Sequence, residues 1–172
     1  MDLLRRFALG DIDAFETLVQ QFQGDIYAWI VRIVRDPGIA EDLTVETLWR
    51  IYRAHQQFRT DGNFAAWARR IATNLAIDYL RRNRPEQILL AEPAAPPPPD
   101  HLLQQETRKK IQQAFRRLPA KLQVAATLAL VEEQPYEEIA DALGTSVGAV
   151  KLRVFRAVRI LRKQLNHLGV RP

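Results

Sequence analysis

Residues 135–165, PYEEIADALGTSVGAVKLRVFRAVRILRKQL, decide the expected fold because they predict two helices joined by a tight turn. Gly144 suits the left-handed position that ends a helix, and Ser146 suits the N-cap of the next one. Ala140 is small enough to let the two helices approach, and Val150 supplies an aliphatic side chain to be buried between them. The spacing of these residues predicts a helix-turn-helix.

The second helix of this unit is strongly basic. From Ser146 to the end, the chain carries seven basic residues and no acidic one: Lys151, Arg153, Arg156, Arg159, Arg162, Lys163 and Arg171. A cationic helix suits the major groove of DNA. Among the cations, Leu152 could contact a thymine methyl group and Phe155 could pack on a neighbouring helix or a protein partner. Ordinary exposed apolar side chains are the alternative.

Composition excludes several classes of function. The chain has 172 residues, 47% of them hydrophobic and 26% charged, which suits one or two small globular domains. It has no cysteine, and its three histidines are scattered, so no metal site is expected. No catalytic triad or phosphate-binding glycine loop is present, so we expect neither an enzyme nor a cofactor. No apolar run approaches the ~18 residues of a membrane span, which favours a soluble cytoplasmic protein without membrane insertion.

The middle of the chain predicts a linker. Residues 84–103 contain six of the ten prolines, four of them consecutive, and consecutive prolines favour an extended polyproline conformation. Such a segment reaches up to ~60 Å at ~3.1 Å per residue. We therefore expect two domains, at residues 1–83 and 104–172; a surface loop inside one domain is the alternative.

Charge differs between these parts. Residues 1–58 carry 6 basic and 9 acidic side chains, whereas residues 104–172 carry 13 basic and 6 acidic ones. An acidic first part followed by basic segments suggests a protein partner and nucleic acid, and solvated helix faces are the alternative.

Both domains are expected to be helical. Apolar residues recur at three- and four-residue spacing and no stretch alternates as a strand, so the predicted fold class is all-α. The expected helices are residues 11–34, 39–55, 64–82, 104–117, 119–132, 136–143 and 146–166.

The expected helix at 64–82 has a polar face with one tryptophan. Trp67, Arg70, Asn74, Asp78 and Arg81 fall on one side of it. An aromatic ring among Arg and Asn could hold unpaired bases, helped by the preceding loop residues Arg59, Asn63 and Phe64. The alternative is a partly buried Trp67 beside an ordinary solvated face.

The expected helix at 39–55 carries a second mixed surface. Glu41, Asp42, Glu46, Trp49, Arg50 and Arg53 lie at exposed positions beside its apolar stripe. One Trp among charges resembles a partner-docking face, although solvated charges are the commoner explanation.

Seven blocks of sequence occur in an order that resembles one known family. They are Asp13-Ala14-Phe15 with Leu18, Asp36-Pro37, AEDLTVETL at 40–48, FAAWARRIATNLAIDYLRR at 64–82, Leu118-Pro119, YEEIA at 136–140 and LGTSVGAVK at 143–151. Together they resemble the extracytoplasmic-function group of bacterial RNA polymerase sigma factors over nearly the whole chain.

The resemblance implies a transcription initiation factor that binds core RNA polymerase and directs it to promoter DNA. It implies a sigma domain 2 in the first part, and a sigma domain 4 in the last part. The core-binding residues implied are Asp42, Glu46, Trp49 and Arg50. The residues implied to capture the −10 element are Arg59, Asn63, Phe64, Trp67, Arg70, Asn74, Asp78 and Arg81. The residues implied to read the −35 element are Thr145, Ser146, Gly148, Ala149, Lys151, Leu152, Arg153 and Arg156.

The resemblance also has consequences for partners and specificity. Sigma factors of this group are usually held by a cognate anti-sigma protein, so such a partner is a further expectation that no residue here identifies. The family commonly has Ser and His where this chain has Leu152 and Phe155, so its −35 preference is expected to differ. Phe155 adds apolar surface that could serve an inhibitory partner.

Two other functions fit the residues without the resemblance. A helix-turn-helix transcriptional regulator acting without core polymerase would bind intact duplex by itself, usually as a dimer on a palindrome. A helical adaptor with incidental basic charge would show no DNA-dependent activity.

Overall fold

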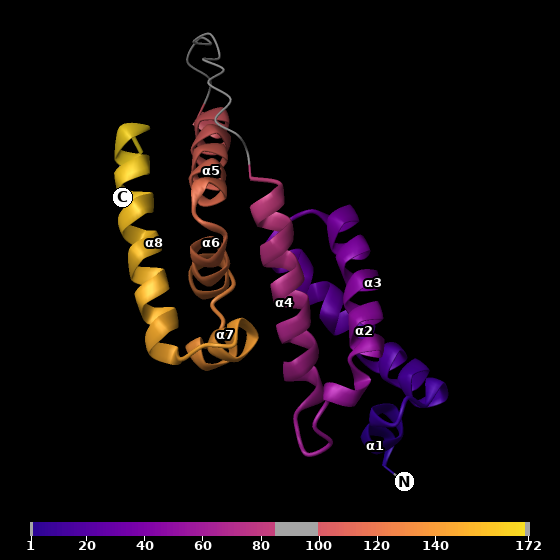
Figure 1. The fold of residues 1–172 in the computed structure, drawn as a ribbon. Coiled ribbons are helices and arrows are strands. Elements are labelled where there is room, and N and C mark those ends of the chain that lie inside the picture. The colour runs from indigo at the N-terminus through magenta and orange to yellow at the C-terminus, as the bar shows by residue number, and fades with distance from the viewer. Residues whose placement is uncertain (1, 85–99, 171–172) are drawn as a thin grey trace.

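The computed structural model describes residues 2–84 and 100–170, and every regular element in these ranges is helical, as predicted (Figure 1). We call residues 2–84 the N-terminal half and residues 100–170 the C-terminal half. The N-terminal half contains α1 (Leu3–Ala8), α2 (Ile12–Val34), α3 (Pro37–Arg53), the 3₁₀ turn η1 (His55–Gln57) and α4 (Phe64–Arg82). The C-terminal half contains α5 (Asp100–Arg117), α6 (Ala120–Ala126), the π-helical turn η2 (Thr127–Val131), α7 (Tyr136–Leu143) and α8 (Val147–His167).

The three long helices of the N-terminal half begin at side-chain caps. Asp11 accepts a hydrogen bond from the backbone N–H of Ala14, and Asp36 and Asn63 cap α3 and α4 in the same way. Each cap satisfies one of the backbone donors that a helix start leaves unpaired. These local signals explain why the predicted and observed starts of these helices agree within two residues.

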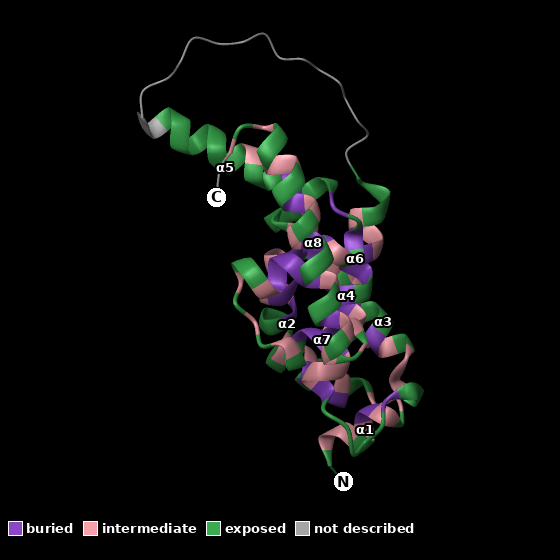
Figure 2. Cartoon of the chain, turned by 90° about the vertical axis from the view of Figure 1, so that its left-hand side faces the viewer, coloured by how far each residue is buried: buried purple, intermediate pink, exposed green. Residues whose placement is uncertain are grey.

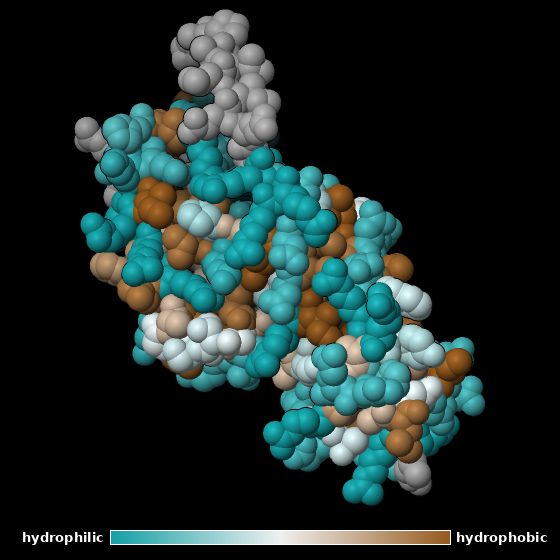
Figure 3. All heavy atoms as spheres, viewed as in Figure 1, coloured by the Kyte–Doolittle hydropathy of each residue, from teal (hydrophilic) through white to brown (hydrophobic). Residues whose placement is uncertain are grey.

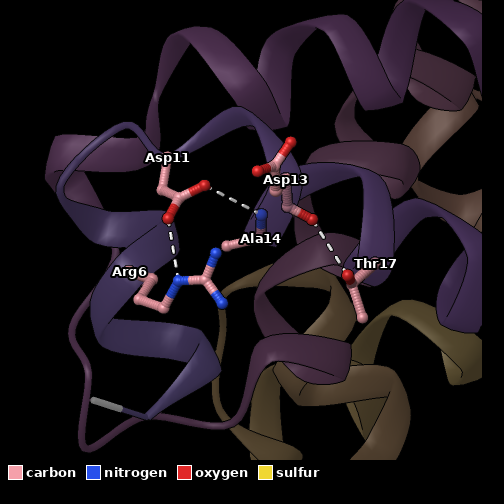
Figure 4. A network of polar contacts seen from close by, with 5 residues as sticks. All are labelled: Arg6, Asp11, Asp13, Ala14 and Thr17. Atoms are coloured by element: carbon pink, nitrogen blue, oxygen red, sulfur yellow. Dashed lines mark hydrogen bonds and ion pairs between the residues drawn. The ribbon is translucent and has the colours of Figure 1, made fainter.

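A small polar network joins α1 to α2 (Figure 4). Arg6 Nε donates to Asp11 Oδ2 at 2.8 Å, while Asp11 Oδ1 accepts from Ala14 N at 3.1 Å. Thr17 Oγ1 donates to the carbonyl of Asp13 at 2.9 Å. The hydrogen bond from Arg6 is the main reason that the pKa of Asp11 lies below its ordinary value, since it stabilises the carboxylate.

Three elements differ from the sequence prediction. The short α1 was not predicted, because six residues are too few to display a helical period. The predicted helix 119–132 is α-helical only to Ala126 and continues as a π-turn. Helix α5 begins at Asp100, four residues before its predicted start, so residues 100–103 are helical rather than linker. All six prolines of the predicted linker lie within 85–99, outside the described residues.

Helix α4 lies at the centre of the molecule (Figure 1). It packs against α2 and α3 on one side and against α6 and α7 on the other. The side chains of Trp29 and Thr73 are buried at its contact with α2, where Trp29 Nε1 donates to Thr73 Oγ1 at 2.9 Å. Because α4 has neighbours on both sides, its buried residues include Thr73, Ala76 and Ile77 as well as Ala68, Ala72 and Leu75.

One apolar core runs through both halves. Its buried members include Ile30 and Ile51 in the N-terminal half, and Val124, Leu128 and Ile139 in the C-terminal half. A second, smaller cluster lies within the C-terminal half, where α5, α6 and α8 meet around Leu118 and Leu161. The first part of α5 extends beyond this cluster and is exposed (Figure 2).

Candidate nucleic-acid and partner interfaces

The predicted helix-turn-helix is present at α7 and α8. Gly144 has φ 62° and ψ 39°, the left-handed conformation that the turn requires. Ser146 Oγ accepts from Ala149 N at 3.1 Å and caps α8. Ala140 and Val150 are both buried between the helices. The local sequence signals for this unit are therefore confirmed.

Most of the predicted −35 residues form an exposed face at the start of α8. Ser146, Gly148, Lys151, Leu152 and Arg156 are exposed, whereas Thr145, Ala149 and Arg153 are partly buried. Helical geometry explains the difference for Arg153, since it lies three residues after the buried Val150 and next to the buried Val154. Arg153 is therefore at the edge of this face.

Phe155 belongs to the same exposed surface. Its side chain is 59% exposed, and the Arg159 guanidinium lies 6.0 Å from the centre of its ring. A cation over an aromatic ring is favourable, which explains how an exposed Phe fits among arginines. In the space-filling view, hydrophobic surface is interspersed with hydrophilic surface on the side where α8 runs (Figure 3).

A groove beside this face was not predicted. It lies between α6 and α8, has a volume of about 300 Å³ and is lined by Leu122, Arg156, Arg159, Ile160 and Lys163. Its apolar residues come from two helices and its cations from one. The only sequence signal for this groove is Ile160, an apolar residue that lies between the basic residues of α8.

The predicted −10 residues separate into three groups, and the first lies at the start of α4. Phe64 is buried, and its ring packs against Phe7, Phe22, Phe58 and Trp67. Asn63 uses its side-chain oxygen to cap α4, accepting from Ala66 N at 3.2 Å. These two residues shape the start of α4, and the Phe64 ring is not exposed for base contact in this structure.

The second group surrounds a pocket. Trp67 is half-buried, with one part packed on the Phe58 and Phe64 rings. It also lines a pocket of about 230 Å³ together with Arg50, Ala54, Gln57, Ile71 and Asn74. Trp67 is thus an anchor in the aromatic core as well as a wall of this pocket. The sequence did not predict that Arg50, from α3, shares the pocket with Trp67 and Asn74.

The third group is held by ion pairs or by the C-terminal half. Arg59 and Asp61 form an exposed pair with Nη2–Oδ2 at 3.0 Å, and the hydrogen bond from Arg59 lowers the pKa of Asp61. Asp78 and Arg81 lie 4.0 Å apart on one turn. Arg70 Nε donates to the carbonyl oxygen of Asp141 in α7 at 3.3 Å.

The predicted polymerase-binding residues lie along α3. Asp42 is exposed, and Trp49 is 54% exposed with its ring 6.2 Å from that of Tyr52. Glu46 and Arg50 form an ion pair of 2.9 Å one turn apart. Together they make a mixed-charge surface around one exposed Trp, which suits contact with a protein.

The described ranges contain neither a metal-ligand cluster nor a membrane-spanning helix. Across residues 2–84 and 100–170, no three acidic, His or Cys side chains gather as metal ligands would. Among the helices described there, none combines the length and apolar character that crossing a bilayer demands.

Comparison with known proteins agrees with this arrangement. Residues 18–86 match Sigma-70 region 2, and residues 108–161 match Sigma-70 region 4. The chain is 32% identical to the ECF RNA polymerase sigma factor SigW of Bacillus subtilis, with 96% of each chain covered.

Two solved structures have a similar fold. The structure of CnrH in complex with the cytosolic domain of CnrY has a TM-score of 0.61 at 22% identity, with 96% of each chain covered. The sigma factor RpoE of Bartonella quintana, in complex with the anti-sigma factor NepR, has a TM-score of 0.53 at 23% identity and covers 88% of this chain and 96% of its own. By its two matched regions and its full-length relative, the chain belongs to the extracytoplasmic-function family of RNA polymerase sigma factors, which direct transcription initiation and are not enzymes.

Proposed function

We propose that this sigma factor binds core RNA polymerase through α3 and recognises promoters with two separate surfaces, acting in the cytoplasm. The pocket beside Trp67 takes part in capturing the −10 strand, and the start of α8 reads the −35 element. The observation that carries this proposal is the pairing of two surfaces of different chemistry. One is a pocket with an aromatic wall, and the other is an exposed cationic helix face.

The pocket suits an unpaired base. Trp67 offers part of an aromatic ring, Ile71 an apolar wall and Asn74 an amide that can donate and accept hydrogen bonds. Stacking on an aromatic ring together with hydrogen bonds to base edges is how single strands are commonly held. Arg50, which also lines the pocket and pairs with Glu46, supplies a guanidinium for the phosphate backbone.

The start of α8 suits duplex DNA. Ser146 and Gly148 keep the first turn small, and its backbone N–H groups favour a phosphate. Lys151 and Arg156 follow on the exposed side, one and two further turns along. Leu152 lies between them and suits a thymine methyl group better than a polar base edge.

The face of α3 suits the polymerase, and a second protein could bind elsewhere. Trp49 provides an exposed aromatic anchor beside Asp42, Glu46 and Arg50, which is the composition of a protein contact. RpoE, which has a similar fold, was solved with an anti-sigma factor. We propose that this chain is also held by an inhibitory protein, which the exposed Phe155 would help to bind.

Run-off transcription with purified core polymerase tests the proposal. We expect the wild-type protein to start transcription at its promoters, and no initiation above core polymerase alone would contradict the proposed function. Asn74→Ala should reduce permanganate reactivity of −10 thymines while leaving −35 duplex binding intact. Asn74 is preferable to Trp67 for this purpose because truncating Trp67 would also damage the aromatic core.

The −35 surface needs a charge-matched pair of variants. Arg156→Ala should weaken promoter binding about 5-fold or more, as expected for a lost DNA contact of ~1–3 kcal/mol. Arg162→Ala removes the same charge from the same helix beyond the predicted contact face, and should have a smaller effect. Equal losses for the two variants would mean that α8 contributes only general positive charge.

A further inference from the structure

The two halves are in direct contact at Arg70, which the family resemblance assigns to the −10 element. Arg70, a predicted −10 residue, donates to the Asp141 carbonyl at 3.3 Å. A methyl group at Gly144, in the turn before α8, would lie 3.5 Å from Arg70 Nε. The helix proposed to capture the −10 strand therefore touches the unit proposed to read the −35 element.

The contact between the halves is electrostatically complementary. After Glu106, every acidic residue of the chain lies between Glu132 and Asp141, although the C-terminal half is basic overall. This acidic segment faces three arginines: Arg32 in α2, Arg35 directly after α2, and Arg69 in α4. The contacts are Arg35 Nη2–Glu132 Oε1 at 2.7 Å, Arg32 Nε–Glu132 Oε2 at 3.7 Å and Arg69 Nη1–Glu138 Oε2 at 3.7 Å.

Arg69 illustrates how closely the acidic segment is integrated with the N-terminal half. Its guanidinium lies 4.9 Å from the centre of the Trp29 ring, so it is placed by a cation–π contact inside its own half. From there it reaches Glu138 of α7. A Glu carboxylate thus occupies a position beside an aromatic-backed arginine where a phosphate could also lie.

With the two halves in contact, which we call the closed arrangement, the protein cannot bind both promoter elements at once. Two DNA sites about two helical turns apart are separated by ~70 Å, at ~34–36 Å per turn. In this structure Arg70 and the turn at Gly144 are within van der Waals reach of each other. The halves must therefore move apart before a promoter can be bound at both elements.

On these grounds, and resting on the proposed function, we propose that the acidic segment 132–141 is an intramolecular latch that competes with DNA. It closes the free protein by binding Arg32, Arg35, Arg69 and Arg70, and it releases them when polymerase or DNA separates the halves. The pairs are partly exposed, with Glu132 at 20% and Arg35 at 50%, so each contributes modestly and is screened by salt. Separating the halves also exposes the part of the apolar core that they share, so the ion pairs bias the closed state and do not hold it alone.

The distance between the halves can be measured in the full chain. Since the protein has no cysteine, Gln21→Cys in α2 and Asn166→Cys in α8 give two exposed labelling sites for energy transfer. We expect the efficiency of energy transfer between the two labels to be high at low salt and to fall as ionic strength rises, because salt screens the ion pairs. Glu132→Arg should lower the closed-to-open ratio by roughly 5-fold or more, because it removes two ion pairs and introduces repulsion.

Two variants make the distance measurement specific. The double variant Glu132→Arg with Arg35→Glu restores opposite charges at the 2.7 Å contact and should regain most of the transfer. Glu16→Arg makes the same change in net charge at an exposed site on α2 and should leave transfer unchanged. Unchanged transfer in Glu132→Arg, or low transfer in the wild type at low salt, would overturn the latch.

Competition with DNA is measured by a separate readout. A fluorescein-labelled single-stranded oligonucleotide should bind Glu132→Arg several-fold more tightly than it binds Glu16→Arg, although both carry the same net charge. Equal affinity of the two variants for the oligonucleotide would show that the acidic segment does not compete with DNA. If the wild type failed to initiate transcription with core polymerase, the proposed function would fall, whereas the distance measurement would still decide the latch.

Discussion

At the scale of single residues, several side chains have two uses. Arg70 is a predicted DNA contact and also a donor to α7, and Trp67 is a core anchor as well as a pocket wall. Such residues are poor targets for simple truncation, since one substitution removes two interactions. An exposed residue with one proposed use, such as Asn74, gives a cleaner test.

The pair Arg6–Asp11 supports a prediction on pH. The Arg6 hydrogen bond is the largest cause of the lowered pKa of Asp11, and the Ala14 N–H is the second. A folded-state pKa below the ordinary 3.8 stabilises the fold above that pH, and this stabilisation is lost as pH falls through the lowered pKa. Arg6→Gln should therefore raise the pKa of Asp11 toward 3.8, measured by NMR titration of its carboxyl carbon.

The neighbouring arginine provides the control. Arg5 is exposed and forms no ion pair within the described ranges, so Arg5→Gln removes a charge without removing the hydrogen bond. It should leave the pKa of Asp11 nearly unchanged. If both variants raised the pKa equally, general charge rather than the Arg6 contact would be its cause.

At the scale of elements, the turn between α7 and α8 depends on backbone conformation. Gly144 has a positive φ of 62°, and an added methyl group would only touch Arg70 at ordinary contact distance. Gly144→Ala should therefore destabilise the protein by ~1–2 kcal/mol through backbone strain alone. Chemical denaturation followed by circular dichroism measures this loss.

Gly148 is the matched control within the same unit. It lies in the first turn of α8, has no positive φ, and an added methyl group would meet only Ser146 Oγ at 3.9 Å. Gly148→Ala should be neutral or stabilising by up to ~1 kcal/mol, because Ala favours helix. A loss of stability as large as that of Gly144→Ala would contradict the role given to the left-handed turn.

At the scale of the whole molecule, the halves share one core. Leu128 is fully buried in the cluster that runs through both halves, whereas Leu118 belongs to the separate cluster of the C-terminal half. All three tryptophans lie in the N-terminal half, so their fluorescence reports on that half alone. Leu128→Ala should therefore lower the denaturation midpoint seen by tryptophan, as part of a total cost of ~2–5 kcal/mol.

Leu118→Ala provides the comparison for this coupling. It creates a cavity of similar chemistry, but we expect it to affect the helical signal of the C-terminal half more than the tryptophan signal. If neither variant changed the tryptophan transition, the two halves would unfold independently. That result would argue against a shared core in solution.

The sequence alone determined most of the helices, the turn at Gly144, the cap at Ser146 and the resemblance to sigma factors, because these depend on neighbours a few residues apart. It also indicated α3 and α8 as surfaces, since exposed Trp49 and Lys151 follow from helical spacing. Only the tertiary structure showed that Arg50 shares a pocket with Trp67, that the Phe64 ring packs against the rings of Phe7, Phe22, Phe58 and Trp67, and that Glu132 meets Arg35. These contacts join residues far apart in the chain, and their formation depends on how whole helices pack, which local spacing does not specify.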